Sequence, residues 1–250
     1  MASFEFDKTT SLEEPVRRDV PREEPCRACH VRHLTICAPL GDGEMHEMAA
    51  LAQPLGLQAG NPLFDEGEPA HHVFNVTAGT VRVYKLLPDG RRQVIGFLFA
   101  GDFLGLANNA CYAYSAEAVT NVTLCRFSRT KLDGLLLRQP KLQTRLLSVA
   151  SHELAVAQEQ MLVLGRKTAK EKIATFLLSL SKRAEARGGA GNPVHLPMSR
   201  TDIGDYLGLT TETVSRTFTQ LRGLDLVGLR TGGYVDLHDP EALQQMAEGH

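Results

Sequence analysis

The spacing of apolar and polar positions changes twice along the chain. From about residue 45 to 128, short runs such as HHVFNV, TVRVYKL and RQVIGFLF alternate apolar and polar residues between glycines. Alternation with a period of two is typical of strands that bury one face, and Pro88-Asp89-Gly90 is a turn sequence between two such runs. The pattern predicts an antiparallel β-roll, or jelly roll, over residues 41–132.

Beyond about residue 130 the spacing becomes helical. The apolar residues that recur every seven positions are Leu135, Leu142, Val149, Val156 and Val163, and Leu146 adds a second position to this seam. A narrow stripe that persists over four heptads is typical of a helix that pairs with a copy of itself. We therefore expect a homodimer and a dimerisation helix over residues 133–165. The alternative is that the stripe packs on the chain's own β-roll, as amphipathic helices commonly do.

Acidic residues interrupt this seam. Glu153 and Glu159, followed by Gln160, occupy positions where a stable coiled coil has apolar groups or attractive pairs. In a parallel dimer each acid approaches its twin, and like charges at short range weaken association. The alternative is that the acids point into solvent and cost little. The predicted dimerisation residues are Leu142, Leu146, Val149, Glu153, Val156, Glu159 and Val163.

Two short helices follow a longer one over residues 168–186, which the segment GGAGNP ends. Ser199 and Asp202 form a capping box at the start of the first, Gly208-Leu209 makes a tight turn, and Thr210 caps the second. A β-hairpin over LVGLRTGGYVDL completes the pattern of a winged helix-turn-helix, predicted over residues 166–250. The alternative is a plain helical bundle with a solvated charged face.

The second short helix, TETVSRTFTQLR, has one apolar and one polar face. Arg216 can donate two bonds to a guanine, Glu212 can accept from a cytosine, and Ser215 can bond a base edge. The predicted DNA-binding residues are Glu212, Ser215, Arg216, Thr211, Thr213 and Arg200. They imply double-stranded DNA as the partner.

Composition qualifies this prediction through the distribution of charge. The 250 residues hold 27 Lys and Arg against 29 Asp and Glu, an ordinary globular composition that excludes a collagen-like or wholly disordered chain. A net charge of −2 does not by itself point to nucleic acid. Residues 165–230, however, hold eleven basic and six acidic residues, a balance of +5 that leaves −7 for the rest. The predicted DNA-reading segment is therefore basic.

The N-terminal region and the cysteines suggest a different chemistry. Residues 1–25 are polar and charged and lack both an apolar signal segment and helical periodicity, so we expect a disordered tail and a cytoplasmic protein that does not enter a membrane. In a reducing compartment, five cysteines are unsuited to disulfides. No Ser-His-Asp order, phosphate loop or carboxylate pair stands out, so we expect no enzyme activity.

Three cysteines crowd into the segment 26–40. Cys26, Cys29 and Cys37 have the spacing C-x2-C-x7-C, which can hold a metal or an iron–sulfur cluster if a fourth ligand is supplied. The candidates for the fourth ligand are Cys111, Cys125, His30 and His33. The spacing alone does not decide between zinc and iron–sulfur. A buried, unreactive role suits Cys111 well, although it can equally be a free thiol.

Taken together, these segments resemble the CRP/FNR superfamily of bacterial regulators over nearly the whole chain after the tail. The stretch IGDYLGLTTETVSR is similar to the recognition segment of the FNR branch, and TLCRFSRTKLDGLL is similar to the stretch around its internal cysteine ligand. The resemblance implies an α+β fold: an N-terminal β-roll like that of cyclic-nucleotide-binding domains, a long dimerisation helix and a C-terminal winged helix-turn-helix.

The resemblance also implies ligands, partners and a function. Cys26, Cys29, Cys37 and Cys125 would hold one oxygen-labile [4Fe–4S] cluster per subunit, while Cys111 has no counterpart. The dimer would form without oxygen, bind palindromic TTGAT-N4-ATCAA sites, and act with RNA polymerase as activator or repressor of anaerobic genes. The seven-residue spacing after Cys29 resembles the FnrL and FnrN type, so the oxygen lability of the cluster can be tuned differently.

Two alternatives remain beside that implication. The same fold can sense nitric oxide or thiol redox state, or use a structural zinc site. Cyclic-AMP regulators of the superfamily place Arg-Ser or Arg-Thr beside the nucleotide phosphate, where this chain has Tyr112-Ala113. Because the phosphate would lack its principal partner, we expect no cyclic nucleotide.

Overall fold

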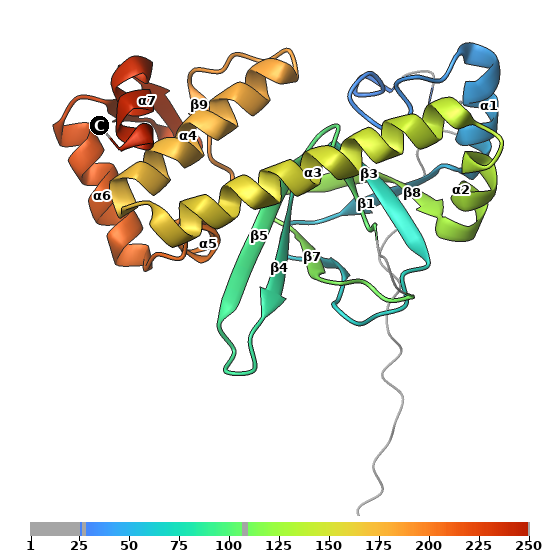
Figure 1. The fold of residues 1–250 in the computed structure, drawn as a ribbon, viewed down its shortest axis with the longest axis horizontal. Coiled ribbons are helices and arrows are strands. Elements are labelled where there is room, and N and C mark those ends of the chain that lie inside the picture. Colours follow the sequence, from blue (N-terminus) through green and yellow to red (C-terminus); the bar gives the residue numbers. More distant parts are fainter. Residues whose placement is uncertain (1–25, 27–28, 107–109, 250) are drawn as a thin grey trace, which may run out of the picture.

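The computed structural model describes residues 26, 29–106 and 110–249. The predicted disordered tail, residues 1–25, lies outside the described residues. The described chain forms a short helix α1 (Asp42–Leu51), a β-roll, helices α2 (Arg129–Leu136) and α3 (Pro140–Arg166), and a C-terminal domain. In Figure 1, α3 crosses the molecule from the roll to that domain.

The β-roll consists of two antiparallel four-stranded sheets. One has the order β1-β8-β3-β6 and contains β1 (Gln53–Leu57), β8 (Val122–Ser128), β3 (His72–Ala78) and β6 (Phe103–Leu104). The other has the order β2-β7-β4-β5 and contains β2 (Pro62–Phe64), β7 (Ser115–Ala118), β4 (Thr80–Leu86) and β5 (Arg92–Phe99). Inward residues such as Val76, Val81 and Leu124 form the core between them. The alternation in the sequence thus reflects one buried face per strand, and the predicted roll is confirmed.

The turn at Pro88-Asp89-Gly90 joins β4 to β5 as predicted. Gly90 adopts a φ of 85°, and its N–H donates to the carbonyl of Leu87. A positive φ suits glycine because it has no Cβ to clash with the backbone. The hairpin projects from the roll in Figure 1.

The prediction of one helix over residues 133–165 is wrong. Helix α2 ends at Leu136, and α3 begins at Pro140, so Leu135 belongs to a different helix from the rest of the stripe. The break follows from proline chemistry: Pro140 has no N–H to donate into a preceding turn, and it disfavours the helical conformation at Gln139.

Part of the predicted dimerisation seam on α3 is buried within the chain itself. Leu142 is 0% exposed and packs, with the half-buried Leu146 and Val149, against the cysteine segment and the roll. At the other end, Val163 is 3% exposed and belongs to the core of the C-terminal domain. The alternative that the stripe packs on its own chain therefore holds at both ends, while Val156 in the middle stays 43% exposed.

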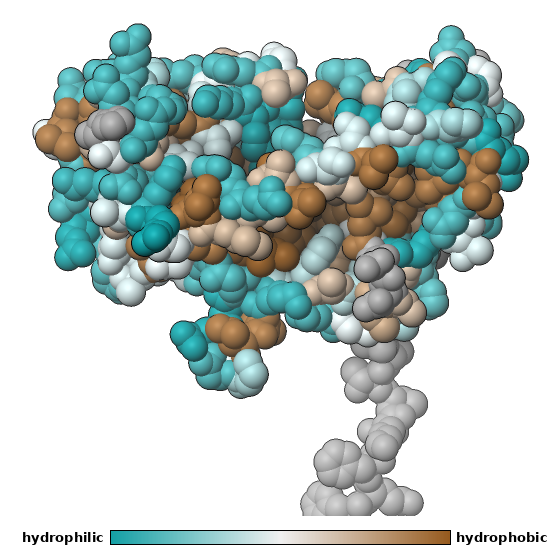
Figure 2. Space-filling view, in the orientation of Figure 1, coloured by the Kyte–Doolittle hydropathy of each residue, from teal (hydrophilic) through white to brown (hydrophobic). Residues whose placement is uncertain are grey.

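A second stripe on α3 is left uncovered. Leu147, Leu154 and Met161 recur every seven residues and are 69%, 60% and 70% exposed. Apolar atoms gather along the middle of this face of the molecule in Figure 2. Residues seven apart lie on one side of a helix, so these three residues, hereafter the exposed stripe, form one continuous apolar edge.

The two acids do not belong to the exposed stripe. Glu159 falls on the opposite side of α3, the side of Val156 and Val163, since helical neighbours are three, four and seven residues apart. Glu153 faces its own chain: although more than a third of the residue is exposed, desolvation of the carboxyl group and the nearby Asp102 raise its pKa. A dimer built on the exposed stripe would not press Glu159 against its twin, so the prediction of repulsion at that residue is not supported.

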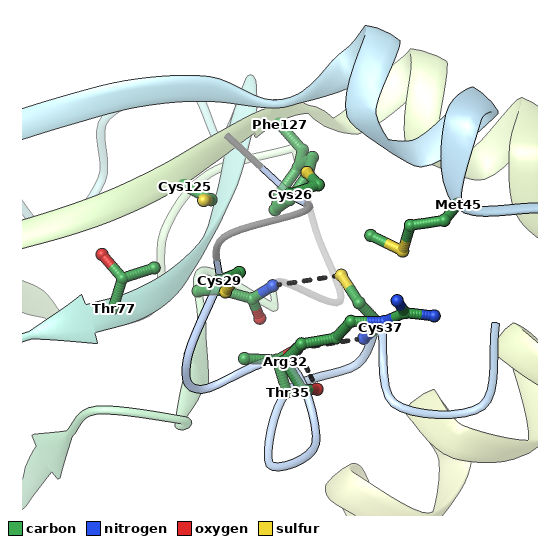
Figure 3. A pocket seen from close by; sticks show the side chains of 10 residues that line it. Cys26, Cys29, Arg32, Thr35, Cys37, Met45, Thr77, Cys125 and Phe127 are labelled. Carbon is green, nitrogen blue, oxygen red and sulfur yellow. Dashed lines mark hydrogen bonds between the residues drawn. The ribbon is translucent and has the colours of Figure 1, made fainter. Parts of the chain in front are cut away.

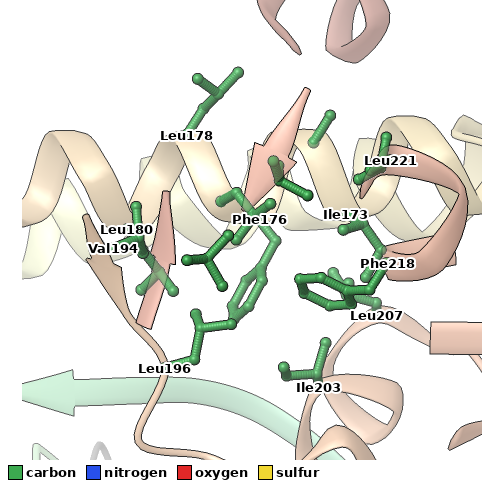
Figure 4. Packing of buried hydrophobic residues seen from close by; sticks show 14 of the residues in the cluster. Ile173, Phe176, Leu178, Leu180, Val194, Leu196, Ile203, Leu207, Phe218 and Leu221 are labelled. Atoms are coloured by element: carbon green, nitrogen blue, oxygen red, sulfur yellow. The ribbon is translucent and has the colours of Figure 1, made fainter. Parts of the chain in front are cut away.

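The C-terminal domain, residues 169–249, is called the reading domain below. It contains α4 (Ala169–Ala186), α5 (Arg200–Leu207), α6 (Thr211–Gly223) and α7 (Pro240–Glu248), with a sheet of β9 (Val194–His195), β10 (Val227–Leu229) and β11 (Tyr234–Leu237). Figure 4 shows its core, where Phe176 of α4, Ile203 of α5 and Phe218 of α6 converge. The predicted capping box at Ser199 and Asp202 and the hairpin around the short 3-10 turn Thr231–Gly233 are both present.

The reading domain is docked on its own β-roll. Asp202 of α5 is buried and accepts from Arg82 of β4 at 2.9 Å and from Arg92 of β5 at 2.6 Å. Beside them, the ring of Phe97 on β5 packs against Phe176 and Tyr206. This interface sets the orientation of α5, and with it that of α6.

Candidate functional site

Helix α6 starts in a geometry that local side chains dictate. Gly208 closes α5 in the left-handed conformation at a φ of 63°, and the Thr210 hydroxyl accepts from the N–H of Thr213 at 3.2 Å. Gly204 permits the close crossing of the two helices, because a Cβ there would lie 2.6 Å from the carbonyl oxygen of Leu209. These contacts fix the angle between α5 and α6.

One face of α6 packs into the core, and the other is exposed. Val214, Phe218 and Leu221 are buried as predicted. Glu212, Ser215 and Arg216 are exposed on the other face. Hydrogen bonds from the backbone N–H of Glu212 and from Thr210 hold the pKa of the Glu212 carboxyl below its ordinary value. The exposed face therefore offers an ionised acceptor and a guanidinium donor close together, the pair of groups that reads base edges.

The three remaining predicted DNA contacts lie around the start of α6. The Thr211 hydroxyl donates to Thr201 of α5 at 3.3 Å, and Thr213 shares a hydrogen bond with Thr210 at 3.1 Å. Arg200 is less free than expected: its guanidinium lies 3.4 Å from the ring centre of Phe218, and burial lowers its pKa. Its Nη1 is enclosed without a hydrogen-bond partner among the described residues. DNA contact by Arg200 stays a prediction.

The second site is a pocket at the other end of α3. Cys26, Cys29 and Cys37 come from the N-terminal segment and Cys125 from β8, and all four line it (Figure 3). A series of turns, in which N–H groups donate to carbonyls three residues earlier, folds the segment from Cys29 to Leu40. The strand pairing of β8 with β3 sets Cys125 opposite Asn75. Cysteines far apart in the sequence are thus gathered at one place.

Two of the pocket thiols, those of Cys37 and Cys125, have raised pKa values. Burial raises the pKa of Cys37 from 9.0 to about 11, against a hydrogen bond from Thr35. Burial and the neighbouring thiols raise the pKa of Cys125 to about 12. Thiolates so close together repel one another, and a bound cation reverses that balance because it stabilises the deprotonated form.

The geometry separates two kinds of occupant. Among the described residues, no three His, Cys, Asp or Glu side chains lie close enough to hold a single metal ion. Zinc bound tetrahedrally by thiolates at about 2.3 Å would need the sulfurs in mutual contact. A [4Fe–4S] cluster binds each thiolate to a different iron, so its ligands stand further apart. A single zinc ion and a cluster therefore require different spacings of the four sulfurs.

The pocket lining also contains a buried polar residue beside one of the thiols. Asn75 donates to the Cys37 sulfur at 3.7 Å, and its buried Oδ1 has no hydrogen-bond partner among the described residues. The enclosed space is about 10 Å³, roughly what one water needs. Sequence reasoning missed Asn75, although a polar residue inside the apolar run HVFNV was a signal.

The other candidates for a fourth ligand lie elsewhere. His30 and His33 are exposed and do not line the pocket. Cys111 is exposed beside Pro69, with which it forms an isolated bridge, so the prediction that a buried role suits it is wrong. The next residue, Tyr112, is buried.

Tyr112, which stands where cyclic-AMP regulators have Arg-Ser or Arg-Thr, is buried in the interior of the roll. Its ring stacks on Phe64 with centroids 3.7 Å apart, and its hydroxyl donates to the carbonyl of His72 at 2.8 Å. An aromatic stack in this position offers an anionic phosphate no positive partner. The absence of a cyclic nucleotide stays a prediction.

Comparison with known proteins supports this organisation. A family model described as "Cyclic nucleotide-binding domain" matches residues 55–139, and one described as "Crp-like helix-turn-helix domain" matches residues 171–246. The nitrogen fixation regulation protein FixK of Bradyrhizobium diazoefficiens is 40% identical over 227 residues, covering 91% of this chain and 95% of that protein. The transcriptional activator protein FnrL of Cereibacter sphaeroides is 33% identical, covering 86% and 88%.

A solved structure agrees with the fold. FixK2 from Bradyrhizobium japonicum is similar with a TM-score of 0.74 and 37% identity, covering 78% of this chain and 96% of that one. These relatives are transcription regulators, which confirms the prediction that the chain is not an enzyme. In the described part of the chain, no helix is both long and apolar enough to cross a bilayer. The chain belongs to the FNR branch of the CRP/FNR family of DNA-binding transcription regulators.

Proposed function

We propose that this protein is an oxygen-responsive regulator in which Cys26, Cys29, Cys37 and Cys125 hold one [4Fe–4S] cluster. The observation that carries the proposal is the pocket, where four thiols from two distant segments converge with few competing ligands. When bound, the cluster would supply an oxygen-sensitive group. The chain's own part is to bring the four thiols together, bury them and tie the segment that carries three of them to β8 and α3.

The DNA contacts of the proposal belong to α6. Glu212 and Arg216 are exposed and one helical turn apart, so both can reach the same base pair in a major groove. Arg216 would donate to guanine and Glu212 would accept from the paired cytosine, with Ser215 beside them. These contacts fit the central G·C pair of palindromic TTGAT-N4-ATCAA sites. Bound there in the cytoplasm, the protein would activate or repress anaerobic genes together with RNA polymerase.

Two copies of α6 are needed to read a palindrome, and the exposed stripe supplies the surface that joins them. Leu147, Leu154 and Met161 would pair with the same residues of a second copy, with Ala150 and Ala157 between them. Heptad spacing with small intervening residues allows two helices to approach closely. We therefore propose a homodimer along α3 on this face, in place of the seam inferred from Val149 and Val156.

The test is anaerobic purification followed by iron and sulfide analysis and a visible absorption spectrum, before and after air. The expected result is about four iron and four sulfide per chain, coloured protein, and bleaching in air with loss of binding to a TTGAT palindrome. Cys125→Ser should lower the iron content by at least half, and Cys111→Ser, the matched control, should leave it unchanged.

Other outcomes would redirect the proposal. A colourless protein with one zinc per chain would make the pocket a structural metal site. Stable iron that responds to nitric oxide and not to air, or a pocket without metal whose thiols oxidise reversibly, would keep the regulator and change its signal. Equal iron loss in Cys111→Ser and Cys125→Ser would mean that the fourth ligand has been assigned wrongly.

A further inference from the structure

The segment between the second and third pocket cysteines, residues 29–37 and here called the cysteine loop, reaches two other parts of the molecule. Its first contact is with α3. The half-buried guanidinium of Arg145 donates from Nη2 to the carbonyl of Leu34 at 2.7 Å and from Nε to that of Thr35 at 3.3 Å. Two charge-assisted bonds from one planar group fix position and orientation together. The cysteine loop is therefore tied to the helix that carries the exposed stripe.

Its second contact is with the turn between β5 and β6. The side chain of Leu34 packs directly on Gly101, where a Cβ would lie 2.6 Å from the Leu34 Cβ. Gly101 has a φ of +100° and donates its N–H to the carbonyl of Val76 at 2.9 Å. A backbone that close to a side chain has no spare room, so movement of Leu34 and movement of this turn are linked.

The residue after Gly101 holds the reading domain. Asp102 accepts from Arg183 at 2.7 Å and from Arg187 at 3.0 Å, both on or directly after α4. Arg187 also donates to the carbonyl of Ala100 at 3.0 Å, and the two guanidinium groups lie 5.0 and 5.1 Å from the ring centre of Phe99. The same turn that Leu34 touches on one side thus anchors α4 on the other.

We infer that Leu34 is a positioning residue that couples the cysteine pocket to the reading domain through the turn at Gly101 and Asp102. The cysteine loop is held at its two ends by pocket residues, Cys29 and Cys37, and its middle is clamped between Arg145 and Gly101. A change in the spacing of the thiols must therefore displace Leu34 or strain the loop. Displacing Leu34 removes the support of the turn on which Asp102 holds α4.

The function of this coupling rests on the proposed function, since there the occupant of the pocket is a cluster. The contacts that carry the coupling are all between residues of the chain itself. Coupling between two sites is reciprocal, so a weakened anchor at α4 must also loosen the cysteine loop. The two directions can be measured separately.

The first experiment is hydrogen exchange with mass spectrometry on the full-length, metal-free protein. Leu34→Ala should speed exchange roughly fivefold or more in peptides covering residues 99–103 and 180–187, because the Leu34 Cγ and Cδ1 atoms that pack on Gly101 are lost. His33→Ala, the exposed neighbour in the same loop, should leave those peptides unchanged. Equal exchange in the two variants over residues 180–187 would overturn the coupling.

The second experiment changes the anchor at α4 and measures exchange in the cysteine loop. It leaves Leu34 in place, so local unfolding caused by Leu34→Ala cannot explain its result. Arg187→Ala should speed exchange in residues 30–36, which lie outside the reading domain and do not contact Arg187 in any hydrogen bond or ion pair of the described chain. Lys182→Ala, on the same helix and without an ion pair to the roll, is the control. No change in residues 30–36 with Arg187→Ala would overturn the coupling.

A third experiment, on protein reconstituted with iron and sulfide, distinguishes this inference from the proposed function. Wild type, Leu34→Ala and His33→Ala are reconstituted anaerobically with ferrous iron and sulfide, and iron per chain is measured. Uptake should be equal, and air should change exchange over residues 180–187 in wild type and His33→Ala but not in Leu34→Ala. An air response that persists in Leu34→Ala would overturn the coupling. A wild type that takes up no iron would refute the proposed cluster, while the metal-free measurements would still decide the coupling.

Discussion

Side chains on the exposed face of α6 can be changed without disturbing the fold. Arg216 is exposed on a helix whose other face is packed by Val214 and Phe218, so its removal leaves the core intact. The hydrogen bonds that hold the pKa of the Glu212 carboxyl below its ordinary value come from its own backbone and from Thr210. The carboxylate and guanidinium groups of this surface therefore depend on the residues of α6 and its cap, and not on packing elsewhere in the molecule.

Arg216→Ala is expected to weaken binding to a TTGAT palindrome by about 1–3 kcal/mol per half-site, because a guanidinium that bonds two base atoms is lost. The measurement is anaerobic fluorescence anisotropy with matched and substituted half-sites. Arg222→Ala, also exposed but in the last turn of α6, should reduce affinity less and equally for both DNAs. Loss of affinity without loss of discrimination in Arg216→Ala would argue that this arginine contacts phosphate only.

The pocket thiols make a prediction about pH in the metal-free protein. The folded state raises the pKa of Cys37 to about 11 and of Cys125 to about 12, from 9.0. Because the folded state holds the protons more tightly than the unfolded chain, this contribution to stability is complete below pH 9 and is lost as the pH rises toward 11–12.

Urea unfolding of the metal-free protein should therefore show a loss of stability between about pH 9 and pH 11. Cys125→Ser should reduce that loss by about 1 kcal/mol or more, since each unit of pKa difference corresponds to about 1.4 kcal/mol. Identical pH dependence in wild type and variant would show that Cys125 ionises in the folded state as it does in the unfolded chain.

At the scale of elements, α3 shows how one helix serves two surfaces. Its ends are buried through Leu142 and Val163, so the helix is rigidly attached to the roll and to the reading domain. Its middle exposes Leu147, Leu154 and Met161. An apolar edge of this length in contact with water costs solubility unless a partner covers it.

Two variants distinguish this face from the seam predicted by the longer stripe. Leu154→Ala should shift the dimer toward monomer by roughly a hundredfold or more in dissociation constant, because both copies lose a buried leucine. Val156→Ala, partly exposed on the opposite face, should leave association unchanged. Sedimentation of the anaerobic protein measures both, and the reverse ranking would restore the original seam.

The whole molecule is held together by charges that cross between domains. Asp202 caps α5 through Ser199 and also accepts from Arg82 and Arg92 of the roll. A buried carboxylate that loses one cationic partner is left partly uncompensated. The orientation of the reading domain therefore depends on residues about a hundred positions earlier in the chain.

Arg92→Ala should lower stability by about 1–3 kcal/mol, because charged hydrogen bonds to Asp202 and Asp205 are lost. Arg91→Ala, the neighbour at the exposed end of the hairpin paired only with Asp89, should change it by less than about 1 kcal/mol. Thermal unfolding and limited proteolysis between the domains measure the difference. Equal effects would show that the interface depends on the aromatic packing of Phe97 and not on the ion pairs.

Local patterns account for the elements that were predicted well. The Ser199 capping box, the turn at Gly90 and the buried face of α6 each depend on residues within a few positions of one another. The break before Pro140 is also a local feature of the sequence, but the regular heptad spacing across it predicts one continuous helix. The gathering of Cys125 with Cys37 followed from a family resemblance and not from spacing, because no local rule joins residues so far apart.

The sequence by itself determined the strands of the roll, the helices of the reading domain and the two faces of α6, since short-range periodicity and capping express those directly. Only the tertiary structure decided which face of α3 is free and how Leu34, Gly101 and Asp102 connect the cysteine pocket to the reading domain. Periodicity reports that a face is apolar but not what covers it. That depends on contacts between distant segments, which packing of the whole chain selects.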